Sequence, residues 1–141
     1  MRFPTFDSIV EDFEFLDDWD DRYKYLIELG DKLEPLTDTE RNPATKVQGC
    51  VSQVWLVSAA GEGSDPEIVF RGDSDAHIVR GLIAVALAAY SGRRASEIAA
   101  ANPDEVFGRL NLSEHITPQR SNGLRAMIKR IKSEAETALA A

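Results

Sequence analysis

Apolar residues recur at the spacing of an α-helix in several segments of the chain and alternate as in a β-strand in others. The expected helices cover residues 8–15, 19–33, 76–90, 96–101 and 104–110, and a last one begins near Asn122. The expected strands cover residues 46–48, 53–59 and 67–71, of which the first has the weakest pattern. Prolines at 35 and 43 and the sequence GEGSDP at 61–66 mark the turns between these elements.

The helical segments differ in how much of their circumference is apolar. Apolar side chains cover most of the circumference of 76–90, which predicts a central, largely buried helix. The second and the last helix each carry a single apolar stripe, so one face of each should meet the core. These stripes comprise Trp19, Tyr23, Leu26, Ile27 and Gly30 in the second helix, and Leu124, Met127, Ile128, Ile131, Ala135 and Leu139 in the last.

Short polar residues mark the helix ends. Asp18 is placed to cap the second helix, and Asp73 or Ser74 is placed to cap the helix over 76–90, because such side chains accept hydrogen bonds from free N–H groups. Gly92 should end that helix. Short strands joined by turns and then followed by helices predict an α+β fold, with a small antiparallel sheet of about three strands packed against several helices.

Length and charge narrow the function classes. The chain has 141 residues, which predicts a single domain over 1–141, and a net charge of −8. Residues 1–40 hold 13 acidic and 4 basic side chains, which form either a solvated face or a docking surface for a basic partner. An acidic chain repels phosphate backbones, so no nucleic-acid partner is expected.

No membrane or export segment is expected either. The longest apolar run, residues 82–90, is shorter than the ~20 residues that a spanning helix needs. The first residues mix acids with aromatics and lack the basic start and apolar core of a signal peptide. With a single cysteine no internal disulfide can form, so we expect a cytoplasmic protein.

That cysteine, Cys50, lies in the sequence VQGCVSQVW between two expected strands. A lone cysteine is most often a small buried apolar residue. Here, however, Gly49 allows unusual backbone angles and leaves its neighbour unshielded, so we expect a reachable thiol at a turn. The apolar neighbours Val47, Val51 and Val54 disfavour the thiolate, which suggests a thiol that stays unreactive until a partner docks.

Other chemistry has weaker support. A hydrolase would need a histidine beside Cys50, and the sequence does not place His77 or His115 there. One cysteine and two widely spaced histidines match no metal-site pattern, so no metal is expected. The turn GEGSD lacks the ending of a phosphate-binding loop. Arg120 precedes the expected last helix and either stabilises the loop or contacts an acidic group on a partner.

Three segments together resemble the SufE family of cysteine desulfuration proteins. They are VQGCVSQVW, FRGDSDAHIVRGLIAV and LSEHITPQRSNGLRAMIKRIK, in this order and at this spacing. YKYLIELGDKLEPL and the following RNP fit as well, so the resemblance covers about residues 19–132. The most specific part is the group Gly49, Cys50, Ser52, Val54 and Trp55.

This resemblance implies an α+β fold like that of SufE and of U-type scaffolds, and it implies a function. Cys50 would take sulfur from the persulfide of a pyridoxal-phosphate (PLP) dependent cysteine desulfurase, SufS-like or CsdA-like. The protein would stimulate that enzyme and pass the sulfur to an iron–sulfur cluster scaffold. The cofactor belongs to the partner, so none is expected here. The protein would act as a sulfurtransferase-like carrier rather than a free-standing enzyme, and a homodimer is left open.

The resemblance also implies that the cysteine lies on a loop tip near an apolar pocket that shelters the persulfide. Gly49 would then act as the hinge of that loop. The partner interface is predicted to include Val51, Ser52, Gln53, Asp73, Asp75 and Arg120.

Three other functions compete with this one. A U-type cluster scaffold would need about three cysteines. A cysteine hydrolase that pairs Cys50 with His115 would turn over without a partner. A structural interaction module would tolerate the loss of Cys50.

Overall fold

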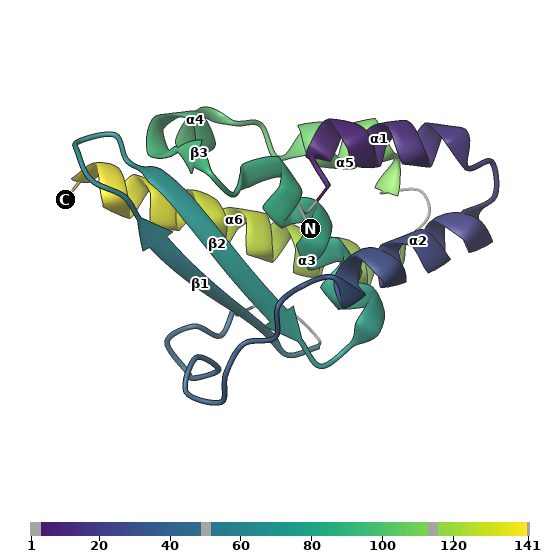
Figure 1. Cartoon of the computed structure of the whole chain (residues 1–141), viewed down its shortest axis with the longest axis horizontal. Helices are drawn as coiled ribbons and strands as arrows, with labels where there is room; N and C mark the ends of the chain where they lie inside the picture. Colours follow the sequence, from purple (N-terminus) through teal and green to yellow (C-terminus); the bar gives the residue numbers. More distant parts are fainter. Residues whose placement is uncertain (1–3, 49–51, 113–115, 141) are drawn as a thin grey trace.

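The computed structural model describes residues 4–48, 52–112 and 116–140, and it confirms an α+β fold (Figure 1). A three-stranded antiparallel sheet lies beside a group of helices, with α3 and α6 behind the long β1–β2 hairpin. The elements are α1 (Phe6–Phe15), α2 (Trp19–Asp31), β1 (Val54–Ala60), β2 (Glu67–Ser74), α3 (His77–Tyr90), β3 (Arg93–Arg94), α4 (Ala95–Ala100), α5 (Asp104–Leu110) and α6 (Pro118–Ala140).

The sheet has the order β1-β2-β3, and one of its three strands is formed by a different segment from the one predicted. β1 pairs with β2 from Val54 opposite Ser74 to Ala60 opposite Ile68. The segment 46–48, expected as a strand, makes only an isolated bridge between Lys46 and Trp55. The third strand is instead β3, which is two residues long and therefore too short for an alternating pattern to reveal.

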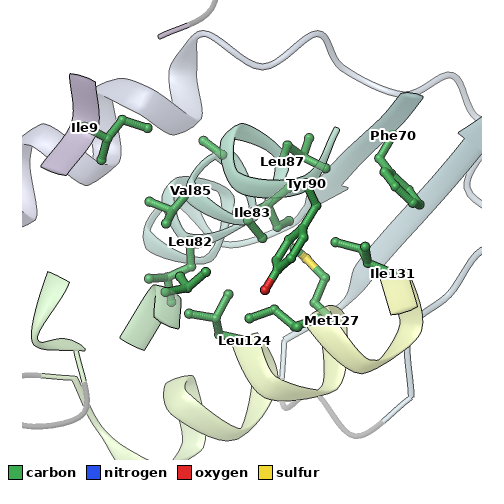
Figure 2. Packing of buried hydrophobic residues seen from close by; sticks show 14 of the residues in the cluster. Ile9, Phe70, Leu82, Ile83, Val85, Leu87, Tyr90, Leu124, Met127 and Ile131 are labelled. Atoms are coloured by element: carbon green, nitrogen blue, oxygen red, sulfur yellow. The ribbon is translucent and has the colours of Figure 1, made fainter. Parts of the chain in front are cut away.

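Helix α3 is the centre of the core, as predicted from its apolar circumference. It packs against α2, β2 and α6, and nine of its residues are buried. Figure 2 shows side chains of α3, including Leu82, Ile83 and Tyr90, gathered with Met127 and Ile131 of α6. A sheet of this size has little area to cover, so a helix buried on several sides supplies much of the core.

Helices α2 and α3 approach each other at two glycines. A Cβ atom on Gly81 would lie 2.2 Å from the carbonyl oxygen of Leu26, and one on Gly30 would lie 2.7 Å from the Gly81 nitrogen. Both obstacles are backbone atoms, which cannot rotate away as a side-chain tip can. The crossing of α2 and α3 therefore requires glycine at both positions.

The helix ends follow the prediction at α2 and depart from it elsewhere. Asp18 caps α2 by accepting from the Asp20 N–H at 3.0 Å, as expected. The cap predicted for α3 is wrong, because β2 continues through Ser74 and the N-cap residue is Ala76 without a side-chain cap bond. Gly92 has φ +85° just after α3 ends at Tyr90, which fits its expected role.

Helix α6 begins four residues earlier than predicted. Pro118 occupies its first position, where the missing N–H of proline costs nothing. The Thr117 side chain accepts from the Arg120 N–H at 3.3 Å and thus satisfies one free donor. The predicted stripe is buried up to Ala135, but Leu139 is 39% exposed because the helix has by then run past the core.

The glycine crossing gives a stability test. Replacing Gly81 with alanine should lower the free energy of unfolding by at least about 2 kcal/mol, because the new methyl group overlaps a backbone carbonyl of α2. Urea denaturation measures this change. Gly108 in α5 is the matched control, since a Cβ there meets nothing within 4 Å. Gly108→Ala should be neutral or stabilising by up to about 1 kcal/mol, and equal losses in both variants would contradict the steric explanation.

Candidate functional site

A short hairpin surrounds the position of the single cysteine. Gly49, Cys50 and Val51 lie outside the described residues. The segment before them, residues 44–47, is here called the incoming arm, and it runs antiparallel to β1. The Val47 N–H donates to the Val54 carbonyl at 2.8 Å, and the Leu56 N–H donates to the Thr45 carbonyl at 2.8 Å.

The chain that leaves the loop is held by the end of β2. The Ser74 hydroxyl donates to the Gln53 carbonyl at 2.6 Å, and the Gln53 N–H donates to the Asp75 carboxylate at 3.1 Å. Two residues predicted for the interface, Gln53 and Asp75, are thus neighbours at this end of the sheet, and both are exposed. Both ends of the loop are therefore anchored by hydrogen bonds within the described residues.

Asp73, also predicted for the interface, has an internal role instead. It is 5% exposed, and its Oδ2 accepts from the Leu36 N–H at 3.1 Å and from Arg41 Nη1 at 3.3 Å. Its Oδ1 lies 3.3 Å from Arg80 Nε on α3. One buried carboxylate thereby joins the end of β2, the loop after α2 and the helix α3, and it contributes no surface for docking.

Arg41 and Asn42 build the turn that leads into the incoming arm. The Asn42 carboxamide oxygen accepts from the N–H groups of Ala44 and Thr45 at 2.9 and 3.0 Å, which closes the turn as asparagine commonly does. The Arg41 guanidinium lies 5.9 Å from the centre of the Trp55 ring on β1. The turn is therefore tied both to Asp73 and to the strand that follows the loop.

A cavity of about 270 Å³ opens next to Ser52. It lies between β1, α3 and the first half of α6. Its apolar walls are formed by Val54, Val79, Leu82, Ile83, Leu124 and Met127. Ser52, Thr117, Gln119 and Arg120 supply polar groups around it. Two of the predicted interface residues, Ser52 and Arg120, thus meet at one cavity.

Arg120 has a partner inside the protein. Its Nη1 donates to the Tyr23 hydroxyl at 3.0 Å, and its guanidinium lies 5.9 Å from the centre of that ring. This contact joins α6 to α2 beside the cavity. The guanidinium has five N–H donors, so the hydrogen bond to Tyr23 leaves donors that can bind other acceptors.

The sequence did not single out the cavity walls. The wall residues of α3 and α6 belong to the same apolar stripes that predicted the core, and periodicity does not tell which part of a stripe is left uncovered. A second cavity of about 410 Å³ between the end of α2, β2 and α3 was also missed, and Phe70, Leu87, Lys32 and Arg71 contribute to its walls.

Within residues 4–48, 52–112 and 116–140, no three or more His, Cys, Asp or Glu side chains come together as a metal site would require. No helix there is long and apolar enough to cross a bilayer. His77 is exposed at the start of α3, while His115, considered as a partner of Cys50, lies outside the described residues.

Comparisons with known proteins agree on one family. The model of the SufE family, described as an Fe–S metabolism associated domain, matches residues 7–135. An uncharacterized SufE-like protein of Rhizobium meliloti (strain 1021) is 55% identical over 138 residues, which cover 97% of this chain and 99% of that protein. Another from Rhizobium etli is 55% identical over 138 residues, or 97% and 93% of the two chains.

A solved structure shows the same fold. The solution structure of a hypothetical protein from Thermus thermophilus matches with a TM-score of 0.76 and 21% sequence identity. The match covers 100% of both chains. At this identity the likeness concerns the fold alone.

The buried carboxylate gives a first test of the site's framework. Asp73→Asn should lower the free energy of unfolding by about 2 kcal/mol or more, because it leaves two arginines near a neutral group. Asp38→Asn is the control, since Asp38 also pairs with Arg41 but its side chain is 99% exposed. That variant should lose much less stability in urea denaturation, because solvent screens an exposed ion pair. Similar losses in the two variants would argue against a special role for Asp73.

Glu40 gives a second test, through pH. The Thr37 N–H and then the Arg71 guanidinium lower the pKa of Glu40 below its ordinary value of 4.5. Its carboxylate therefore stabilises the fold above pH 4.5, and this contribution is lost as the pH falls through the lowered pKa. The difference in thermal midpoint between wild type and Glu40→Gln should be largest near neutral pH and shrink below pH 4.5.

The control for this pH test is Glu62→Gln, which changes an exposed glutamate in the turn between β1 and β2. The thermal midpoint of this variant should follow that of the wild type over the same pH range. The difference in thermal midpoint between wild type and Glu40→Gln should not stay constant as the pH falls well below the ordinary glutamate pKa. A constant difference would contradict the stabilising role of the Glu40 carboxylate.

Proposed function

Because this chain belongs to the SufE family, whose domain is associated with iron–sulfur metabolism, we propose that it is a sulfur acceptor with Cys50 as the accepting residue. The donor is the persulfide of a PLP-dependent cysteine desulfurase of the SufS or CsdA type. The receiver is an iron–sulfur cluster scaffold. The observation that carries this proposal is the cavity beside Ser52, two positions after the only thiol in the chain.

The transfer is a thiol–persulfide exchange. The Cys50 thiolate attacks the outer sulfur of the donor's persulfide, a new sulfur–sulfur bond forms on Cys50, and the donor's thiolate leaves with the electrons of the broken bond. The proton lost by Cys50 balances the proton that the donor thiolate regains. No net oxidation occurs, so the step needs one nucleophile and no metal or cofactor on this chain.

The anchored hairpin and the cavity support this chemistry. Cys50 precedes Ser52 by two positions, so the covalent chain keeps their Cα atoms within about 7 Å of each other. A cavity of about 270 Å³ is many times the size of a water molecule and can shelter a persulfide from reductants. We propose that the loop turns at Gly49 and presents the sulfur when the desulfurase docks.

The docking face would lie around the same cavity. Ser52 and Arg120 border the cavity, and Gln53 and Asp75 are exposed at the neighbouring end of the sheet. We propose that these four residues, together with Val51 of the loop itself, form the surface that meets the desulfurase. Exposed polar groups at the rim of an interface favour orientation and specificity more than affinity.

A single thiol suits a carrier better than the alternatives. A second cysteine in the same chain could attack the persulfide and release the sulfur as a disulfide forms. A cluster scaffold of the U type holds its cluster with about three cysteines, and this chain has one.

The proposal is tested by intact mass spectrometry. The protein is incubated with a SufS-like or CsdA-like desulfurase and free cysteine, beside the Cys50→Ser variant as the matched control. The wild type should gain the mass of one or more sulfur atoms, a reductant should remove them, and the variant should gain none. An unmodified wild type, where a known acceptor is loaded under the same conditions, would refute the assignment for that desulfurase.

A further inference from the structure

The incoming arm has two edges, and only one of them faces β1. The Val47 N–H and the Thr45 carbonyl form its two backbone bonds to β1. The carbonyls of Ala44 and Lys46 alternate with these groups and point away from the strand. Unpaired carbonyls on the outer edge of a strand segment need a partner or water.

The side chain of Arg130 on α6 provides that partner. Its Nη2 donates to the Ala44 carbonyl at 2.7 Å, and its Nη1 donates to the Lys46 carbonyl at 3.3 Å. Guanidinium carries five N–H donors in a planar fork, so it can bind two alternate carbonyls at once, whereas an ammonium group acts as a single point. One residue of α6 thus binds two carbonyls on the outer edge of the arm.

Two further contacts hold Arg130 in place. Its Nε donates to the Glu134 carboxylate at 3.0 Å, one helical turn away. The other oxygen of Glu134 accepts from the Ser58 hydroxyl on β1 at 3.4 Å. The contacts close a ring that runs from the arm to Arg130, to Glu134, to β1 and back to the arm.

This ring of contacts includes the helix α6, which also forms part of the cavity wall. Leu124 and Met127, which line the cavity, lie on the same helix as Arg130. The arm ends at Val47, three positions before Cys50. We propose that Arg130 is a positioning residue for the sulfur-transfer reaction, which fixes the arm to α6 and thereby restrains the chain that leads to Cys50. This inference rests on the proposed function for its purpose, but its geometry can be tested without a desulfurase.

The first measurement is amide hydrogen exchange on the isolated protein. In Arg130→Ala, the amides of Val47 and Leu56, which join the arm to β1, should exchange at least tenfold faster than in the wild type. Amides of the buried α3 serve as an internal reference and should be unchanged. In parallel, alkylation of Cys50 by iodoacetamide should become at least threefold faster, because a loosened arm restrains the chain before the thiol less.

Matched variants separate positioning from general damage. Arg125→Ala removes another arginine of α6, which pairs with Asp104 and stacks on Phe107, and it should leave both readouts unchanged. Arg130→Lys keeps the charge but lacks the planar fork that spans the two carbonyls, so its rates should fall between those of wild type and Arg130→Ala. Glu134→Gln should act in the same direction and more weakly, and it keeps the inference testable if Arg130→Ala does not fold.

The outcomes distinguish this inference from the proposed function. Unchanged exchange of the arm amides in the folded variants would overturn the role of Arg130. Faster exchange with unchanged alkylation would show that the arm does not position Cys50, which also overturns it. If both readouts change as expected, the positioning role holds even where the mass experiment finds no sulfur on Cys50, because neither readout uses a desulfurase.

Discussion

The carboxylate of Asp73 is buried at the end of β2 between two arginines from distant parts of the chain. Arg41 lies in the loop after α2, and Arg80 lies on α3. A buried carboxylate is costly without such partners, so Asp73 is stable in this place only where the three segments meet. The residues that follow, Ser74 and Asp75, hold the chain that leaves the cysteine loop. The site therefore depends on this ion-pair cluster, although the cluster itself does not touch the cavity.

The rest of the framework follows from the small sheet. Two long strands and one of two residues cannot enclose a core alone, and the buried helix α3 completes it from one side while α6 crosses behind β1. The space between β1, α3 and the first half of α6 remains open as the cavity. The proposed sulfur acceptor would need a nucleophile that is sheltered at rest and reachable on docking, and a cavity next to Ser52 is compatible with that proposal.

Sequence patterns predicted the helices and the two long strands, because each repeats its spacing over several residues. They failed where the pattern was short or ambiguous. The two residues of β3 carry no period, and the polar residues Asp73 and Ser74 fit both a helix cap and the buried end of a strand. Of the candidate site, Ser52, Gln53, Asp75 and Arg120 lie around one end of the sheet, whereas the walls of the cavity were indistinguishable from core.

The sequence by itself determined the family, the single thiol, the acidic charge and the order of most elements, since these depend on residue identity and on spacings of two to four residues. Only the tertiary structure decided which polar groups meet. Arg130 and Ala44 are 86 positions apart, and Leu36 and Asp73 are 37 apart. No local spacing encodes such pairs, because they form only after packing brings α6 to the arm and β2 to the loop after α2.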